Sequence, residues 1–329
     1  MIPATIVHVP FRREASIRIF DSRDKTLRLC ILLFASLPGA PSAAGGPEPP
    51  KMVYVHVAPE SDQDERQLFA WTILRQALER TRQSFGYYEI DEARVSLQQR
   101  RQIQALTQGG REIDVALLPV LPGVEESAVI PVRIPVVGGL WGYRVLLIRG
   151  DRQARFDAVQ DLEDLRKLTL GQSWFWPDTE ILARAGLTVV TGEAYEGLFK
   201  MLVSSRFDAF SRGITEAEPE YRARQKRLPE LAIERHILLH YPMPEYFWFA
   251  DDETGRRLAR RVQEGLLTMV ADHSLCRMVE ETFGESLRSL DLDHRTLIEL
   301  PNPLLGAADH LDDRGFWCDP LGYRSASQP

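Results

Sequence analysis

Hydrophobic and polar residues form alternating blocks along this chain, and the blocks predict strands and helices in turn. The runs MVYVHVAPESD (52–62) and YYEIDEARV (87–95) are rich in β-branched and aromatic residues, which is typical of strands. Residues 65–81 place apolar side chains at the spacing of an amphipathic helix, and residues 96–110 predict a second helix that ends in glycines. EIDVALLPVL (112–121) reads as a buried strand. Such alternation predicts a parallel sheet with helices on its faces.

The same alternation returns in the second half of the chain. Strands are predicted at 168–172, 187–192 and 207–213, and helices at 177–186 and 194–205. Residues 130–148 read as one long extended segment, with three glycines in its middle, that leaves one unit and enters another. The extended run HILLHYPMPEYFWFADD (236–252) can carry the chain back, and two helices follow it. The pattern therefore predicts two α/β units.

Charge narrows the possible partners. The chain has 329 residues and a formal net charge of −7. A nucleic-acid binder needs a basic face that neutralises phosphates, so this balance argues against nucleic acid as a partner.

The N-terminal 44 residues have the pattern of a secretory signal peptide. Basic residues at 25–28 precede a short apolar run, 29–37, and then small residues, with Ser42 and Ala44 at the −3 and −1 places. The alternative is an uncleaved membrane anchor. Residues 45–51 form a Pro/Gly linker. Without residues 1–44 the chain keeps 34 basic and 44 acidic residues, and we expect a periplasmic protein.

Two cysteines, Cys276 and Cys318, remain after this segment. In an oxidising compartment they can pair and attach the C-terminal tail to the body of the protein. Two separate free thiols are the equal alternative.

Sequence patterns do not support catalysis. The chain contains no P-loop and no G-x-G-x-x-G, and GESLRS lacks the second glycine of a nucleophile elbow. His236 and His240 lie four apart in a predicted strand, where that spacing does not converge on a metal. We expect no cofactor and no metal.

Binding candidates gather where predicted strands end. Ser173, Trp174 and Trp176 lie between a strand and a helix, where backbone N–H groups bind anions and a tryptophan can stack on a ligand. The alternative is that both tryptophans pack against the neighbouring helix.

Further candidates lie in the glycine-rich crossover and at the next strand end. Trp141, Tyr143 and Arg144 lie in the crossover, and this arginine can pair with a carboxylate or point to solvent. Arg212 ends a predicted strand, where α/β folds place ligand contacts.

Three segments together resemble family 3 of the periplasmic solute-binding proteins, the polar-amino-acid type. DAVQDLEDLRKLTLGQSW (157–174) resembles the segment that opens that family's second lobe, and YEGLFKMLVSSRFDAFSRG (195–213) its helix and strand before ligand contacts. Residues 247–284 are similar to its C-terminal pair of helices. The resemblance covers roughly residues 52–295, and the order and spacing of the segments make it specific.

The resemblance implies the type II periplasmic binding fold: two Rossmann-like α/β lobes joined by two crossover strands, with a ligand held in the cleft. It assigns residues 52–140 and 243–300 to lobe 1 and residues 141–242 to lobe 2. Residues 301–329 would form a C-terminal tail. It also implies a monomer that binds a small molecule and a membrane partner, either a transporter permease or a sensor.

The chain departs from the family at both charged ligand contacts. The family's first-lobe arginine would fall near Glu125, and its second-lobe aspartate falls on Gly213, next to Arg212. We therefore expect Arg144 and Arg212 to neutralise an acidic group on the ligand, enclosed by Trp141, Trp174 and Trp176. A cationic ligand would instead face Glu60 and Glu125.

Three functions remain open after this comparison with the family. The first is capture of a small polar solute, amino-acid-like or an organic acid, for an ABC-type transporter. The second is a sensor or accessory protein that has lost its ligand. The third is a dehydratase-like enzyme on this fold, with Glu60, Glu125 or Glu196 as general acid.

Overall fold

A computed structural model describes residues 51–61, 64–108, 112–121, 124, 128–306, 309 and 316–318. The predicted signal peptide, Glu125 and most of the linker and tail lie outside these residues. Among the described residues, no helix has the length and apolar character needed to cross a membrane.

The first lobe is built on two small sheets. β1 (Met52–His56) pairs in parallel with β2 (Tyr88–Glu92). β11 (Glu245–Ala250) lies between β3 (Ala116–Pro119) and β4 (Val129–Val132) and is antiparallel to both. The helices of this lobe are α1 (Leu68–Arg80), α2 (Arg82–Phe85), α3 (Gln99–Thr107) and α9 (Glu253–Ala271).

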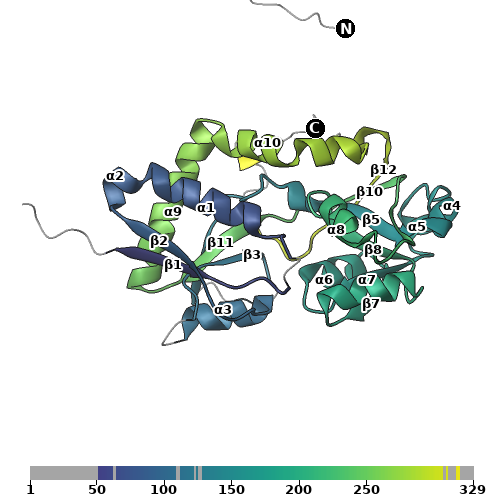
Figure 1. The fold of residues 1–329 in the computed structure, drawn as a ribbon, viewed down its shortest axis with the longest axis horizontal. Coiled ribbons are helices and arrows are strands. Elements are labelled where there is room, and N and C mark those ends of the chain that lie inside the picture. The colour runs from purple at the N-terminus through teal and green to yellow at the C-terminus, as the bar shows by residue number, and fades with distance from the viewer. Residues whose placement is uncertain are drawn as a thin grey trace, which may run out of the picture. The chain divides into compact units, whose positions relative to one another are not determined.

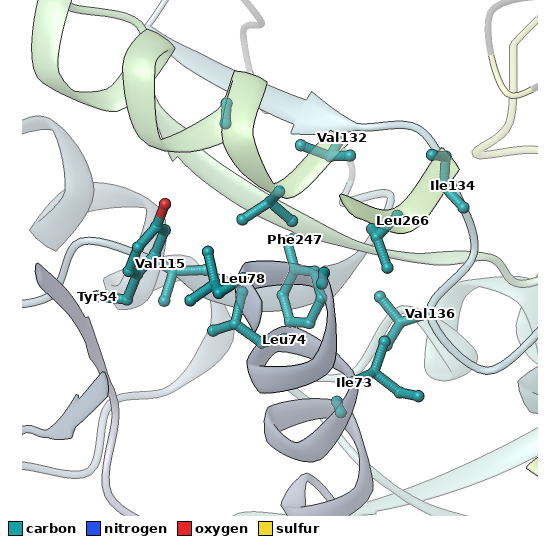
Figure 2. Close-up of a cluster of buried hydrophobic side chains, with 14 of the residues drawn as sticks. Tyr54, Ile73, Leu74, Leu78, Val115, Val132, Ile134, Val136, Phe247 and Leu266 are labelled. Atoms are coloured by element: carbon teal, nitrogen blue, oxygen red, sulfur yellow. The ribbon is translucent and has the colours of Figure 1, made fainter. Parts of the chain in front are cut away.

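Helix α1 covers these sheets because its apolar residues lie on one face. Ile73, Leu74 and Leu78 are fully buried and recur at three- and four-residue spacing. They pack with Phe247 of β11 and Leu266 of α9 (Figure 2). Strand β11 thus lies in the core of the first lobe, although it follows the second lobe in the chain (Figure 1).

The second lobe contains one seven-stranded sheet in the order β12-β10-β5-β8-β6-β7, with β9 also paired to β5. Its strands are β5 (Tyr143–Arg149), β6 (Thr169–Ser173), β7 (Thr188–Gly192), β8 (Ala209–Gly213), β9 (Leu231–Ile233), β10 (Ile237–His240) and β12 (Thr296–Glu299). Its helices are α4 (Gln153–Phe156), α5 (Leu162–Leu165), α6 (Pro177–Arg184), α7 (Tyr195–Val203) and α8 (Ala217–Arg224). β6 is parallel to β7 and β8, as the alternating pattern predicted. The predicted fold class, two α/β lobes, is confirmed.

The first crossover differs from the single long strand that we predicted. β4 ends at Val132, and β5 begins only at Tyr143, after a 3₁₀ turn at Leu140–Gly142. Gly138 and Gly139 have φ values of 57° and 81°, which side chains rarely adopt, so the chain turns here. The glycines interrupt the strand because they supply this turn.

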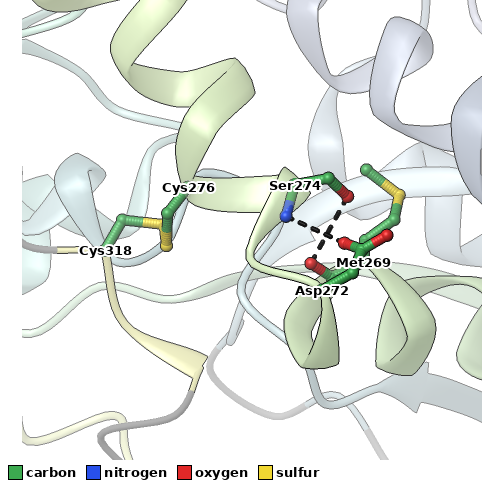
Figure 3. The surroundings of a disulfide bond; sticks show 5 residues. All are labelled: Met269, Asp272, Ser274, Cys276 and Cys318. Carbon is green, nitrogen blue, oxygen red and sulfur yellow. Dashed lines mark hydrogen bonds between the residues drawn. A yellow bond between two sulfur atoms is a disulfide. The ribbon is translucent and has the colours of Figure 1, made fainter.

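The tail is attached beside that turn. A disulfide joins Cys318 to Cys276 of α10 (Ser274–Ser289), as Figure 3 shows. The backbone N–H of Cys318 donates to the carbonyl of Gly138 at 3.0 Å. A Cβ atom on Gly139 would meet the ring of Trp317 at 1.8 Å, so the tail packs closely on the crossover.

One predicted lobe boundary needs correction. Residues 243–300 were assigned to the first lobe, but β12 pairs with β10 in the sheet of the second lobe. Helix α10 contacts both lobes: Leu275 packs in the first-lobe core, and Leu287 packs with the second-lobe cluster. The short run TLIE carries no signal for its distant partner strand, which is why the sequence did not predict this pairing.

Candidate ligand-binding site

A cavity of about 110 Å³ lies between residues of the two lobes. The first lobe contributes the loop after β1 and the start of α1, and the second contributes the start of β5, the end of β8 and the start of α6. Its charged lining residues are Glu60, Asp64, Arg66, Glu92, Arg144, Asp178, Arg212, Glu216 and Glu245. Six of these nine are acidic, so carboxylates outnumber guanidinium groups on the described wall.

Local structure sets the second-lobe side of this cavity. β6 ends at Ser173, and Trp176 is the N-cap of α6, with Pro177 at the first helical position. The hydroxyl of Thr179 donates to the carbonyl of Ser173 at 2.7 Å and fixes the turn. The turn directs Trp176 and Asp178 towards the end of β8, where Arg212 lies.

Arg144 is buried between two carboxylates of its own lobe. Its Nη2 lies 3.0 Å from Asp178 Oδ1, and its Nη1 lies 3.4 Å from Glu216 Oε2. The hydroxyl of Tyr241 also donates to Asp178, at 2.6 Å. The Arg144 charge is therefore compensated inside the protein.

Arg212 is paired in the same way. Its Nη2 lies 3.1 Å from Glu216 Oε1, and its Nε and Nη2 donate to Glu220 at 2.8 and 2.6 Å. The guanidinium also lies over the ring of Trp176, 4.8 Å from its centroid. Arg144 and Arg212 therefore each have two carboxylate partners in their own lobe, and the expectation that they neutralise an acidic group on a ligand stays a prediction.

Glu216 takes the space next to Gly213, where the resemblance places an aspartate. The N–H of Gly213 donates to Glu216 Oε2 at 2.9 Å, and a Cβ atom on Gly213 would lie 2.7 Å from that oxygen. Burial alone would raise the pKa of Glu216, but the charges of Arg212 and Arg144 lower it below its ordinary value. Glu216 is therefore ionised and held between the two arginines.

Glu245 behaves in the opposite way. Its side chain is 2% exposed, and burial raises its pKa well above the ordinary value. Glu216 and Asp178 raise it further, and Arg144 and Arg66 offset only part of the shift. Burial therefore favours the protonated form of Glu245, in contrast to Glu216.

Four buried polar atoms of cavity-lining residues have no hydrogen-bond partner among the described residues. They are Oε2 of Glu245, Nε of Arg144, and the Oε1 atoms of Gln99 and Gln102. Buried polar atoms in folded proteins are almost always paired, because an unpaired one costs about 1–3 kcal/mol. Unpaired atoms on a cavity wall are groups that a ligand can satisfy.

Arg66 connects the two sides of the cavity. It pairs with Asp64 at 2.7 Å and with Glu60 at 3.1 Å, both in the first lobe. Its guanidinium lies over the second-lobe ring of Tyr195, 4.3 Å from the centroid. The hydroxyl of Tyr195 donates to Glu220 at 2.6 Å, which joins this contact to the Arg212 network.

The structure brings five of the eight predicted ligand contacts to the cavity wall: Glu60, Trp141, Arg144, Trp176 and Arg212. The other three do not line this cavity. Tyr143 stacks on His240 at 4.3 Å, Ser173 is buried behind the turn, and Trp174 is 55% exposed and lies against Phe175. Trp176 lines the cavity at this turn, whereas the role of Trp174 in enclosing a ligand stays a prediction.

Sequence reasoning missed Arg66, Asp178, Glu216, Glu220 and Glu245. One signal was present for Glu245, which is the single charged residue in the otherwise apolar or aromatic run YPMPEYFWFA (241–250). A carboxyl group in such a run is buried, and buried carboxyl groups with perturbed pKa values gather at functional sites.

The described residues contain no group of three or more His, Cys, Asp or Glu side chains placed to hold a metal ion.

No protein-family model matches this chain, and no curated protein does. Solved structures are similar to it at low sequence identity. An ancestral arginine-binding protein bound to arginine has 16% identity and a TM-score of 0.50, over 71% of this chain and 98% of that one. The GluR0 ligand-binding core in complex with L-glutamate has 14% identity and a TM-score of 0.50, over 72% and 99%. The BvgS VFT2 domain of Bordetella pertussis has 18% identity and a TM-score of 0.50, over 70% and 93%. These likenesses show that the chain has the fold of the type II periplasmic binding proteins.

Proposed function

We propose that this protein captures a small polar solute between its two lobes and delivers it to a membrane transporter. The observation that carries the proposal is the cavity with unpaired polar atoms on Glu245 and Arg144. A wall of buried charged groups is costly to fold, and a bound solute that satisfies them recovers part of that cost.

The cavity is small for a ligand site. Pockets for drug-sized ligands run from roughly 300 to 1,000 Å³, and this one has about 110 Å³. The solute is therefore a small molecule that two lobes can enclose. The arginine and L-glutamate complexes of similar structures support the size class, whereas the chemistry must come from this chain's own residues.

Capture would use the crossovers as a hinge. The Gly138–Gly139 turn lies between β4 of the first lobe and β5 of the second, and such turns absorb changes in φ and ψ. A solute that contacts both lobes favours the closed arrangement by its difference in affinity for the two states.

The place of action would be the periplasm. The N-terminal pattern of a secretory signal peptide supports this, and so does the disulfide between Cys276 and Cys318, since disulfides persist in oxidising compartments.

A thermal-shift screen tests the proposal directly. The protein is unfolded in guanidinium and refolded without reductant to remove carried ligand, then heated with amino acids, polyamines, keto acids and aromatic acids. A solute at a hundred times its Kd should stabilise the protein by about 2.7 kcal/mol. A flat response, with no small molecule released from protein purified under native conditions, would overturn the proposal and favour a sensor or accessory role.

A second candidate function rests on Glu245. A carboxyl group with a raised pKa on a cavity wall is what a general acid requires, so a dehydratase-like activity on cyclic acids is the alternative. Of the general acids named from the sequence, Glu60 lines the cavity, Glu196 pairs with Arg224 instead, and Glu125 lies outside the described residues. Turnover of a prephenate-like acid by the refolded protein, lost in Glu245→Gln, would favour the enzyme.

A further inference from the structure

Each guanidinium group around the cavity already pairs with carboxylates of the protein, although Nε of Arg144 keeps an unpaired N–H. Arg144 pairs with Asp178 and Glu216, and Arg212 pairs with Glu216 and Glu220. Arg66 pairs with Asp64 and Glu60. A ligand carboxylate would have to compete with these internal partners, each within 3.4 Å of its arginine.

The acidic side chains of the cavity wall are not all paired in this way. The lining holds six acidic side chains against three arginines, and Glu245 forms no ion pair with an arginine among the described residues. Its Oε2 is buried and has no hydrogen-bond partner there. The excess charge of this wall is therefore negative, and the unsatisfied acceptor lies where a donor from a ligand would satisfy it.

We propose that the captured solute carries a cationic nitrogen, as an ammonium or guanidinium group, and that the carboxylate of Glu245 binds it. This inference rests on the proposed function and deepens it by naming the charge of the solute. It reverses the expectation from the sequence, in which arginines held an acidic group.

Binding would move one proton. Burial, Glu216 and Asp178 raise the pKa of Glu245 by more than Arg144 and Arg66 lower it, so the surroundings favour the protonated carboxyl group. A cation against Oε2 supplies the missing positive charge, so the proton leaves to the solvent buffer and the carboxylate pairs with the cation. Charge balances, since one positive charge enters as one leaves.

Aromatic rings complete the wall. Trp71, Trp141 and Trp176 line the same cavity, and tryptophan faces attract cations within about 6 Å. Arg212 and Arg66 already lie over the Trp176 ring, at 4.8 and 5.5 Å. Trp71 stacks on His56, so one of its faces is already covered. Among the described residues, Trp141 is the tryptophan of this wall that makes no ring-stacking or cation–π contact.

Isothermal titration calorimetry on the refolded protein tests the inference. The cationic probes are putrescine, L-lysine and L-arginine, and the acidic ones, which carry no amino group, are glutarate and phenylpyruvate. We expect binding of at least one cationic probe, with about one proton released when the titration is repeated in buffers of different ionisation enthalpy. Neither acidic probe should bind more tightly than the cations.

Two variants locate the effect. Glu245→Gln replaces a neutral carboxyl group by a neutral amide of the same shape, so the fold should remain, and the Kd for the cation should rise roughly 10- to 100-fold. Proton release should disappear with it. Glu264→Gln on the exposed face of α9 is the matched control, and it should bind as the wild type does.

The outcomes separate this inference from the proposed function. Binding of an acidic probe alone overturns the cationic solute but leaves solute capture intact. Binding of a cation that Glu245→Gln does not weaken, or that releases no proton, overturns the role of Glu245. If no probe binds and native mass spectrometry finds no small molecule on the purified protein, both proposals fail together.

Discussion

Two buried arginine sites in this molecule are satisfied in opposite ways. Arg261 of α9 lies in the first lobe and donates five hydrogen bonds, three of them to the carbonyls of Leu78, Gly86 and Tyr87. The remaining two go to the hydroxyl of Thr81 and the sulfur of Met52. Every donor of this guanidinium has a partner, and burial lowers its pKa from the ordinary value.

The arginines of the cavity use side-chain carboxylates instead. Arg144 and Arg212 share Glu216, and this network leaves Nε of Arg144 and Oε2 of the nearby Glu245 unpaired. The partners of Arg261 join the end of α1 to α2 and β2, so that site holds the fold together. A completed site is typical of structure, whereas an incomplete one next to a cavity indicates a place for a ligand.

The largest effect should come from removing a cation of the cavity. Arg212→Met leaves Glu216 and Glu220 buried without their nearest positive charge, so the free energy of unfolding should fall by about 3–5 kcal/mol. Urea unfolding measures this loss. Adding Glu220→Gln should restore part of the lost stability, because the second change removes one uncompensated charge. A loss below about 1 kcal/mol in the single variant would mean that the network is not buried as described.

Replacing Arg261 should lower the free energy of unfolding somewhat less than replacing Arg212. Arg261→Met leaves three backbone carbonyls without this donor, but no charge remains behind, so we expect a loss of about 3 kcal/mol. The matched control is Arg260→Met on the exposed face of the same helix, which should change stability by less than about 0.5 kcal/mol. Solute affinity should be the same in both variants, and a weakened affinity in Arg261→Met alone would break the comparison.

Glu245 should make stability depend on pH. Its carboxyl group has a raised pKa in the folded protein, against about 4.5 in the unfolded chain. Its contribution to stability is fully present below the unfolded pKa and is lost as pH rises towards the folded one, because unfolding then releases a proton.

The glutamine side chain introduced by Glu245→Gln does not titrate, so the variant loses this pH dependence of stability. The stability of the variant relative to the wild type should therefore rise with pH by up to about 1.4 kcal/mol per unit. Urea unfolding of both proteins between about pH 5 and 8 measures the difference. A constant difference over this range would show that the pKa of Glu245 is not raised in the folded protein.

The lobes could be predicted from the sequence because the pattern of apolar residues within each segment indicates whether it forms a helix or a strand. The apolar spacing of residues 73, 74 and 78 predicts the buried face of α1, and the run 168–172 predicts β6. The pairing of β12 with β10 joins residues about 60 apart, and a four-residue strand carries no information about such a partner.

The site was predictable only in part, for a similar reason. The strand-end rule placed Arg212 at the cavity, but Glu216 and Glu220 lie in the polar run TEAEPEYRAR (215–224), which reads as a solvated helix. Their burial depends on where α8 packs. Likewise, Trp174 and Trp176 are two residues apart, and only the N-cap geometry of α6 decides that Trp176 is 8% exposed and Trp174 55%.

The smallest change in stability and solute affinity should come from the partly exposed ion pair of Glu60 and Arg66 at the edge of the cavity. Glu60 lies 3.1 Å from Arg66, but Arg66 also has Asp64 at 2.7 Å. Glu60→Gln therefore leaves the guanidinium paired, and the free energy of unfolding should change by less than about 1 kcal/mol. Affinity for a cationic probe should fall less than tenfold, since one of several carboxylates is lost while Glu245 remains. Calorimetry of Glu60→Gln beside Glu245→Gln measures the contrast. If Glu60→Gln weakens binding more than Glu245→Gln, the cation lies at the first-lobe loop, and the unpaired oxygen of Glu245 has another explanation.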